Sequence, residues 1–167
     1  MPSFLRDELR DMIQRDGYPY LFLIQSRKIR CTMWDGKEHP AECMHCAGTG
    51  WTVRWARRKA MKQNASDVVS HHSLTRPVSA GEIWSPAYVF FTDPTLPLHP
   101  GDRIYDVGWR QGKPWGLSGV YDIRHAEQVR GEGGKPVYLY IGAMHLSTHI
   151  GFHERLIQQM MRGSPDA

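Results

Sequence analysis

The stretch from Cys31 to Trp51 constrains this chain more than any other part of its sequence. It reads CTMWDGKEHPAECMHCAGTGW and contains all three cysteines of the protein. Two of them, Cys43 and Cys46, form a Cys-x-x-Cys pair that is followed by Gly48-Thr49-Gly50. This spacing lets two thiolates converge on one ion from a tight turn, and the glycines let the backbone fold back around it. A loop this polar has no core of its own, so a bound metal is the simplest way to order it.

Structural zinc sites take four ligands in tetrahedral geometry, and three thiolates leave one position open. His39 is the best fourth ligand within the loop. His45 lies between two ligands and is expected to point away, whereas Met33 offers only a neutral thioether, which suits zinc poorly. A closed site of this kind leaves no position for a water molecule, so no metal chemistry is expected. The predicted ligands of this structural zinc are Cys31, His39, Cys43 and Cys46.

Two other interpretations of the cysteines stay open. In the first, Cys31 is an ordinary core residue, the Cys-x-x-Cys pair is incidental and no metal is bound. In the second, Cys43 and Cys46 are redox-active, although the βαβ context of thioredoxin-like motifs is missing. An odd number of cysteines in one loop argues against a disulfide framework and favours a reducing compartment.

Hydrophobic patterning predicts a mainly β chain with one short helix near each end. Apolar stripes at helical spacing predict helices over residues 3–15 and 152–161. Continuous or alternating apolar runs predict six strands, at residues 20–24, 51–55, 87–91, 102–107, 119–123 and 137–141. Gly131-Glu132-Gly133-Gly134 is typical of the turn of a hairpin that joins the last two strands.

Short strands with glycine and proline between them favour a small antiparallel β-barrel of SH3 or OB type, because closure removes exposed sheet edges. At 167 residues we expect a single β-barrel domain over 1–167. The zinc-knuckle-like, metal-binding loop is expected as an insertion at 27–51, and a long loop at 57–81. No apolar run approaches the ~20 residues of a membrane helix, and the charged N-terminus does not resemble a signal peptide. No membrane association is expected.

Positive charge is concentrated around the metal loop. Nine of the 21 Lys and Arg residues lie between Arg27 and Lys62, against three acidic residues. Such a segment suggests an anionic neighbour such as DNA. A solvated face, or one that meets an acidic protein, is the alternative. The candidate DNA-facing or partner-facing residues are Arg27, Lys28, Arg30, Arg54, Arg57, Arg58, Lys59 and Lys62.

Catalytic patterns are missing from the sequence, and no enzyme activity is expected. His145 and His149 lack the glutamate of a His-Glu-x-x-His metalloprotease. The glycine-rich turn near Lys135 lacks the Ser or Thr of a phosphate-binding loop. There is also no Gly-x-Ser-x-Gly nucleophile elbow. A metal-dependent hydrolase would instead need an open coordination position.

Four passages together resemble the neck, or head-to-tail connector, proteins of tailed bacteriophages. They are the strand and arginine-rich segment 20–31, the knuckle Cys43-Met44-His45-Cys46-Ala47-Gly48-Thr49-Gly50, the segment His99-Pro100-Gly101-Asp102-Arg103-Ile104-Tyr105, and the hairpin from Val120 to Tyr138. A four-cysteine knuckle would carry a second cysteine near Cys31, where Met33 stands. The knuckle also resembles one arm of the Hsp40 zinc domain, but that family needs such arms in pairs.

The resemblance to neck proteins implies a structural virion protein without catalysis. It implies a homo-oligomeric ring that connects a portal or adaptor protein to a tail-side neck or tail terminator protein, with packaged DNA in its channel. The protein would then be located in the virion neck, and in the host cytoplasm during assembly. The alternative, drawn from the basic metal loop itself, is a zinc-containing nucleic-acid-binding module.

Overall fold

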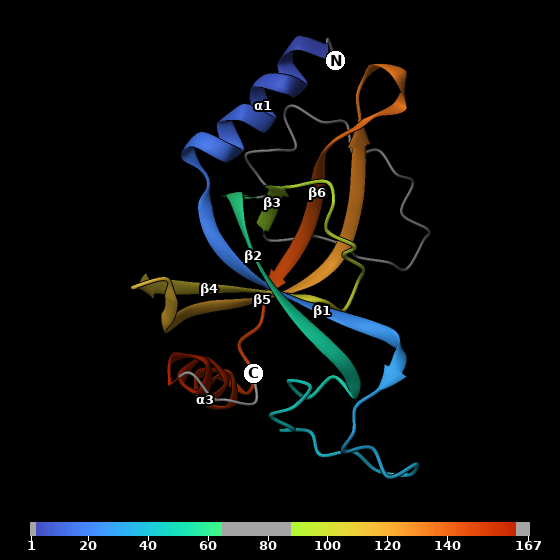
Figure 1. Cartoon of the computed structure of the whole chain (residues 1–167), viewed down its shortest axis with the longest axis vertical. Helices are drawn as coiled ribbons and strands as arrows, with labels where there is room; N and C mark the ends of the chain where they lie inside the picture. The colour runs from blue at the N-terminus through green and yellow to red at the C-terminus, as the bar shows by residue number, and fades with distance from the viewer. Residues whose placement is uncertain (1–2, 65–87, 163–167) are drawn as a thin grey trace. The chain divides into compact units, whose positions relative to one another are not determined.

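The computed structural model describes residues 3–64 and 88–162, with side chains from Asp7 onward. This part of the chain is mainly β, with six strands in an antiparallel sheet and a short helix near each end (Figure 1). In chain order the elements are α1 Ser3–Asp16, β1 Tyr18–Arg30, β2 Trp51–Asn64, β3 Tyr88–Thr92, β4 Arg103–Arg110, β5 Lys113–Arg130, the 3₁₀ turn η1 Glu132–Gly134, β6 Pro136–His145 and α3 Ile150–Met161.

The six predicted strands and two predicted helices are all present, and most are longer than expected. Strand β1 continues to Arg30, so the irregular part of the metal loop covers 31–50 rather than 27–51. The prediction of a long loop over 57–81 is wrong for residues 57–64. Strand β2 continues to Asn64 and pairs there with β3. Its exposed polar side chains hide the strand pattern, while Ala60 is buried. The rest of the expected loop, 65–81, lies outside the described residues.

The strands hydrogen-bond in the cyclic order β1-β2-β3-β6-β5-β4, so the sheet closes on itself. The described residues fall into two compact units. The first, the α1 unit, comprises residues 3–19, 58–64, 88–101 and 122–145. The second, the cysteine unit, comprises residues 20–57, 102–121 and 146–162. The single domain over 1–167 stays a prediction.

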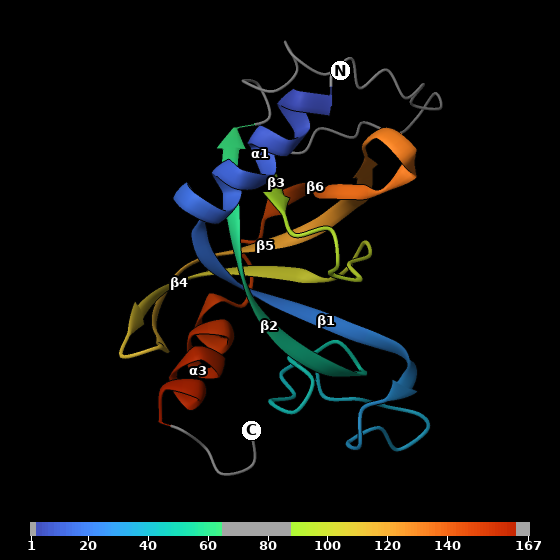
Figure 2. The same cartoon turned by 45° about the horizontal axis from the view of Figure 1, so that its top comes forward.

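The α1 unit is built around the pairing of β3 with β2 and β6. Phe91 of β3 lies opposite Met61 on one side and Tyr140 on the other. Helix α1 packs against β3 and β6 (Figure 2) and contributes Ile13, which is 2% exposed, to the same core. Phe91 also meets the ring of Tyr138 edge-on, 5.7 Å between centroids. The apolar stripe of the helix is therefore explained by burial against this sheet.

The cysteine unit has its own core, formed where α3 covers β1 and β4. Strands β1 and β4 pair with Leu21 opposite Tyr105. The apolar stripe of α3 includes Phe152 and Leu156, which pack against this pair together with Ala47 from the metal loop. Ala47, which directly follows Cys46 in the metal loop, thus belongs to this core. The loop is therefore attached to the sheet and to α3.

Candidate metal centre

The structure brings together the four residues that the sequence predicts as metal ligands. The loop that carries them leaves the end of β1 and returns at the start of β2 (Figure 1). One ligand atom from each of Cys31, His39, Cys43 and Cys46 lies within 4.8 Å of all the others. All three cysteines are buried and free, and no disulfide joins them. This cluster, called the Cys3His cluster below, can hold a metal ion.

Two distances within the Cys3His cluster match those of a four-coordinate ion. The Sγ atoms of Cys31 and Cys43 are 3.8 Å apart, and Cys46 Sγ lies 3.3 Å from Nε2 of His39. Metal–sulfur bonds of about 2.3 Å at tetrahedral angles place two sulfurs about 3.8 Å apart. A disulfide would bring them to about 2.0 Å. The arrangement therefore suits ligands that share one central ion.

The turn after the Cys-x-x-Cys pair explains why glycine stands at position 48. The N–H of Gly48 donates to the carbonyl of Cys43 at 3.1 Å, which closes the turn. Ala47 and Gly48 have φ of 53° and 73°, and this left-handed conformation is costly for residues that carry a Cβ. A Cβ on Gly48 would lie only 2.3 Å from the carbonyl oxygen of Ala41. Glycine at this position therefore permits both the reversal and the close approach of the backbone.

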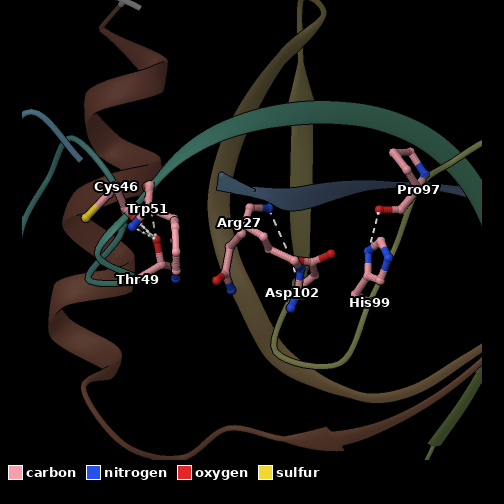
Figure 3. A network of polar contacts seen from close by, with 8 residues as sticks. Arg27, Cys46, Thr49, Trp51, Pro97, His99 and Asp102 are labelled. Atoms are coloured by element: carbon pink, nitrogen blue, oxygen red, sulfur yellow. Dashed lines mark hydrogen bonds and ion pairs between the residues drawn. The ribbon is translucent and has the colours of Figure 1, made fainter. Parts of the chain in front are cut away.

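Hydrogen bonds close the two ends of the loop next to the cluster. The N–H of Cys31 donates to the carbonyl of Gly50 at 3.0 Å. The hydroxyl of Thr49 donates to the carbonyl of Cys46 at 2.8 Å and accepts the N–H of Trp51 at 3.2 Å (Figure 3). Thr49 thus joins the knuckle to the first residue of β2, which the sequence motif alone did not predict.

Backbone N–H groups also point at two of the sulfurs. Met33 donates to Sγ of Cys31 at 3.5 Å, and Gly50 donates to Sγ of Cys46 at 3.4 Å. Such donors stabilise the negative charge of thiolates, which is the form that binds a metal. The loop backbone therefore supplies the outer hydrogen bonds that a metal–thiolate site needs.

The two histidines of the loop occupy different environments. His39 is half-buried and stacks against Trp34, with ring centroids 6.0 Å apart. His45 is exposed, and it is not part of the Cys3His cluster. The thioether of Met33 is also outside the cluster, in a side chain that is 50% exposed. The expectation that His45 points away from the site agrees with this arrangement.

The metal loop is attached to the rest of the cysteine unit by residues that sequence reasoning missed. The guanidinium of Arg103, in β4, donates to the carbonyl of Ala47 at 2.7 Å. Arg155 of α3 forms an ion pair with Glu42 at 2.9 Å. Glu42 and Arg155 are half-exposed, so their pair adds little stability, whereas the Arg103 bond lies in a partly buried position.

The eight basic residues predicted to face a partner are all exposed, but they are divided between the two units. Five of them lie in the cysteine unit: Arg27, Lys28, Arg30, Arg54 and Arg57. The α1 unit contains the other three: Arg58, Lys59 and Lys62. The predicted basic segment is therefore shared between the two units.

Several of these basic side chains have partners within the protein. Arg27 donates to Asp102, whose carboxylate is fully buried, at 3.2 Å (Figure 3). The Nζ of Lys59 donates to the carbonyl of Gln14 at 2.7 Å. These contacts give both residues a structural role that their charge alone did not indicate.

A buried polar pair in the cysteine unit is the main feature that the sequence did not reveal. Nδ1 of His153 lies 2.9 Å from the hydroxyl of Tyr105, and both side chains are buried. Burial lowers the pKa of His153 to about 4, and the nearby charges of Arg103 and His149 act in the same direction. Burial raises the pKa of Tyr105, so its neutral hydroxyl can donate to the imidazole. One signal was available, because residue 153 falls within the apolar stripe of the predicted helix 152–161.

Comparisons with known protein families, with curated proteins and with solved structures gave no match. Within residues 3–64 and 88–162, no helix combines the length and the apolar composition that crossing a membrane requires. The functional interpretation therefore depends on the geometry of the cysteine unit and on the sequence motifs that carry the resemblance.

Proposed function

We propose that the Cys3His cluster binds zinc and that this zinc is structural. The single observation that carries the proposal is the convergence of four ligand atoms within 4.8 Å of one another. Three thiolates and one imidazole form a donor set that zinc favours, and four protein ligands close the coordination shell. The zinc would hold the loop between β1 and β2 in place, as a zinc knuckle inserted into an SH3-like or OB-like barrel.

Metal analysis with a matched pair of variants tests the zinc site. We expect about one zinc per chain after purification without chelator. His39→Ala should weaken zinc affinity by more than about 100-fold, because removal of a direct ligand exceeds the 10–100-fold effect of losing an outer partner. His45→Ala, at the exposed histidine of the same loop, is the control and should retain zinc. Equal zinc content in both variants would exclude His39 as a ligand.

The role of the whole chain that we propose is that of a ring-forming structural protein of a tailed-phage neck, which connects the portal to the tail and helps to retain packaged DNA. The support comes from the sequence passages that resemble this class and from a site without an open metal position. A subunit of this kind contributes surfaces rather than chemistry, and a closed zinc site stabilises such a surface. Its partners would be further copies of the chain, a portal or adaptor protein and a tail-side protein.

Imaging tests this role. Zinc-loaded protein is mixed with the portal complex of the same phage, and the mixture is examined by mass photometry and negative-stain microscopy. We expect rings attached to one end of the portal. A chain that stays monomeric and does not bind the portal would contradict the proposal.

The second candidate is a zinc-containing nucleic-acid-binding module that acts in the cell. The observation that favours it is a set of arginines placed over tryptophan rings in the cysteine unit, of which Arg57 over Trp109, at 4.2 Å, is one. Tight, salt-dependent binding to free DNA by a chain that neither forms rings nor binds the portal would favour this candidate over the neck protein.

A further inference from the structure

Arg30 occupies an unusual position beside the metal loop. It is the last residue of β1 and directly precedes the ligand Cys31. The central carbon of its guanidinium lies 3.8 Å from the ring centroid of Trp51 and 4.9 Å from that of Trp34. The side chain is exposed. Apart from these two rings, the part of the chain that the structure describes gives its guanidinium no hydrogen bond or ion pair.

Trp34 contacts residues of the Cys3His cluster directly, and Trp51 adjoins a residue that does. The ring of Trp34 stacks on that of the ligand His39, and the backbone N–H of Trp34 donates to the carbonyl of Cys31 at 3.0 Å. Trp51 follows Gly50, whose N–H donates to Sγ of Cys46. A metal bound by these ligands would therefore fix the rings that contact Arg30.

Contacts of this kind leave the guanidinium able to bind an anion. Aromatic rings attract a guanidinium through its flat faces, while its N–H donors point outward in the plane. Those donors match a phosphate group in a bidentate arrangement. We propose that Arg30, placed over the rings of Trp34 and Trp51, binds the phosphate backbone of DNA. This inference rests on the metal centre proposed above.

The surroundings of Arg30 favour a polyanion as the ligand. Lys28 lies two residues earlier in β1, so its side chain leaves the same face of the strand, and it is also exposed. The described residues of the cysteine unit include eleven Lys and Arg against six Asp and Glu. Contacts to phosphates carry no sequence information, so Arg30 would bind DNA of any sequence, as a channel or neck protein requires.

Fluorescence anisotropy with labelled DNA tests the proposal. Zinc-loaded protein is titrated into two duplexes of unrelated sequence over a range of NaCl concentrations. Arg30→Ala should weaken binding to both duplexes by about tenfold, since a charge-assisted contact is lost. It should also reduce the slope of log affinity against log salt by about one. Arg30→Lys keeps the charge but loses the planar fork, so its affinity should be intermediate.

The matched control is Arg110, which lies over the ring of Trp115 at 4.7 Å and is not connected to the cluster. Arg110→Ala should leave the affinity for DNA within about twofold of the wild type. An effect of this size is expected when an exposed charge that makes no bidentate phosphate contact is removed. Chelation should reduce wild-type affinity to the level of Arg30→Ala, because Trp34 and Trp51 lose their anchor. Zinc content is measured for every variant, so that loss of the metal is recognised before DNA binding is interpreted.

Several outcomes would overturn the inference while leaving the zinc site intact. The first is zinc-loaded Arg30→Ala that binds DNA like the wild type with the same salt slope. The second is an equal loss in Arg110→Ala, which would show only general attraction of charge. The third is competition by polyglutamate as strong as that by DNA, which would assign the surface to an acidic protein. A chain without zinc would instead refute the metal centre itself.

Discussion

Protonation of His153 should limit the stability of this protein in mild acid. The imidazole is 2% exposed, and its Nδ1 lies 2.9 Å from the hydroxyl of Tyr105. Burial is the main reason why the pKa of His153 falls from 6.5 to about 4, and the charges of Arg103 and His149 lower it further. The neutral imidazole can accept the tyrosine hydrogen, whereas the protonated ring would have to donate in that position.

The direction and size of the effect follow from proton linkage. Well above pH 6.5 the histidine is neutral in both the folded and the unfolded chain, so it adds no pH dependence. Below that pH the unfolded chain binds a proton that the folded chain does not, and the free energy of unfolding decreases. From the pKa values of 6.5 and about 4, the loss is about 2 kcal/mol at pH 5 and about 3 kcal/mol at pH 4.

Urea unfolding of the wild type and of His153→Gln between pH 8 and pH 4.5 measures this loss. Glutamine can accept the Tyr105 hydrogen bond but does not titrate in this range. Protonation of the metal ligands affects both proteins alike, so the difference between them isolates His153. The stability of the wild type relative to the variant should decrease between pH 6.5 and pH 4.5. A difference that stays flat, or an NMR titration of His153 with a pKa near 6.5, would refute the reasoning.

Two further substitutions test the backbone and the buried charge of the cysteine unit. Gly48→Ala should destabilise the protein by more than about 2 kcal/mol, because its Cβ would lie 2.3 Å from the Ala41 carbonyl at a φ of 73°. Gly50→Ala, with a φ of 78° but no atom within 4 Å of the new Cβ, should cost only about 1 kcal/mol and is the control in thermal unfolding. Asp102→Ala should cost about 3 kcal/mol in urea unfolding, because a fully buried carboxylate that accepts from Arg27 is lost. An unchanged urea midpoint would show that the Asp102 carboxylate makes no net contribution to the free energy of unfolding.

Much of the fold could be predicted because its signals are local. A strand such as β3 is a short run of large apolar residues, and the stripe of α3 repeats at helical spacing. The Cys3His cluster is local in the same sense, since Cys31 and Cys43 are 12 residues apart and His39 and Cys46 are seven apart. The end of β2 was missed because most of its side chains after Trp55 are exposed and polar, and its buried positions there are the small residues Ala56 and Ala60.

The contacts that the sequence did not reveal join residues far apart in the chain. Arg27 and Asp102 are separated by 75 residues, Arg103 and Ala47 by 56, and Tyr105 and His153 by 48. No spacing rule connects such pairs, because only the folded topology brings them together.

Two long-range contacts also show how the metal loop is connected to the rest of the cysteine unit. A knuckle that only stabilised itself would need no residue in the core, yet Ala47 packs with Leu156 of α3 and accepts the Arg103 hydrogen bond. The turn that carries Cys43 and Cys46 is therefore a structural part of the cysteine unit. If the cluster holds the proposed zinc, its removal should consequently weaken the packing of α3 as well as the loop.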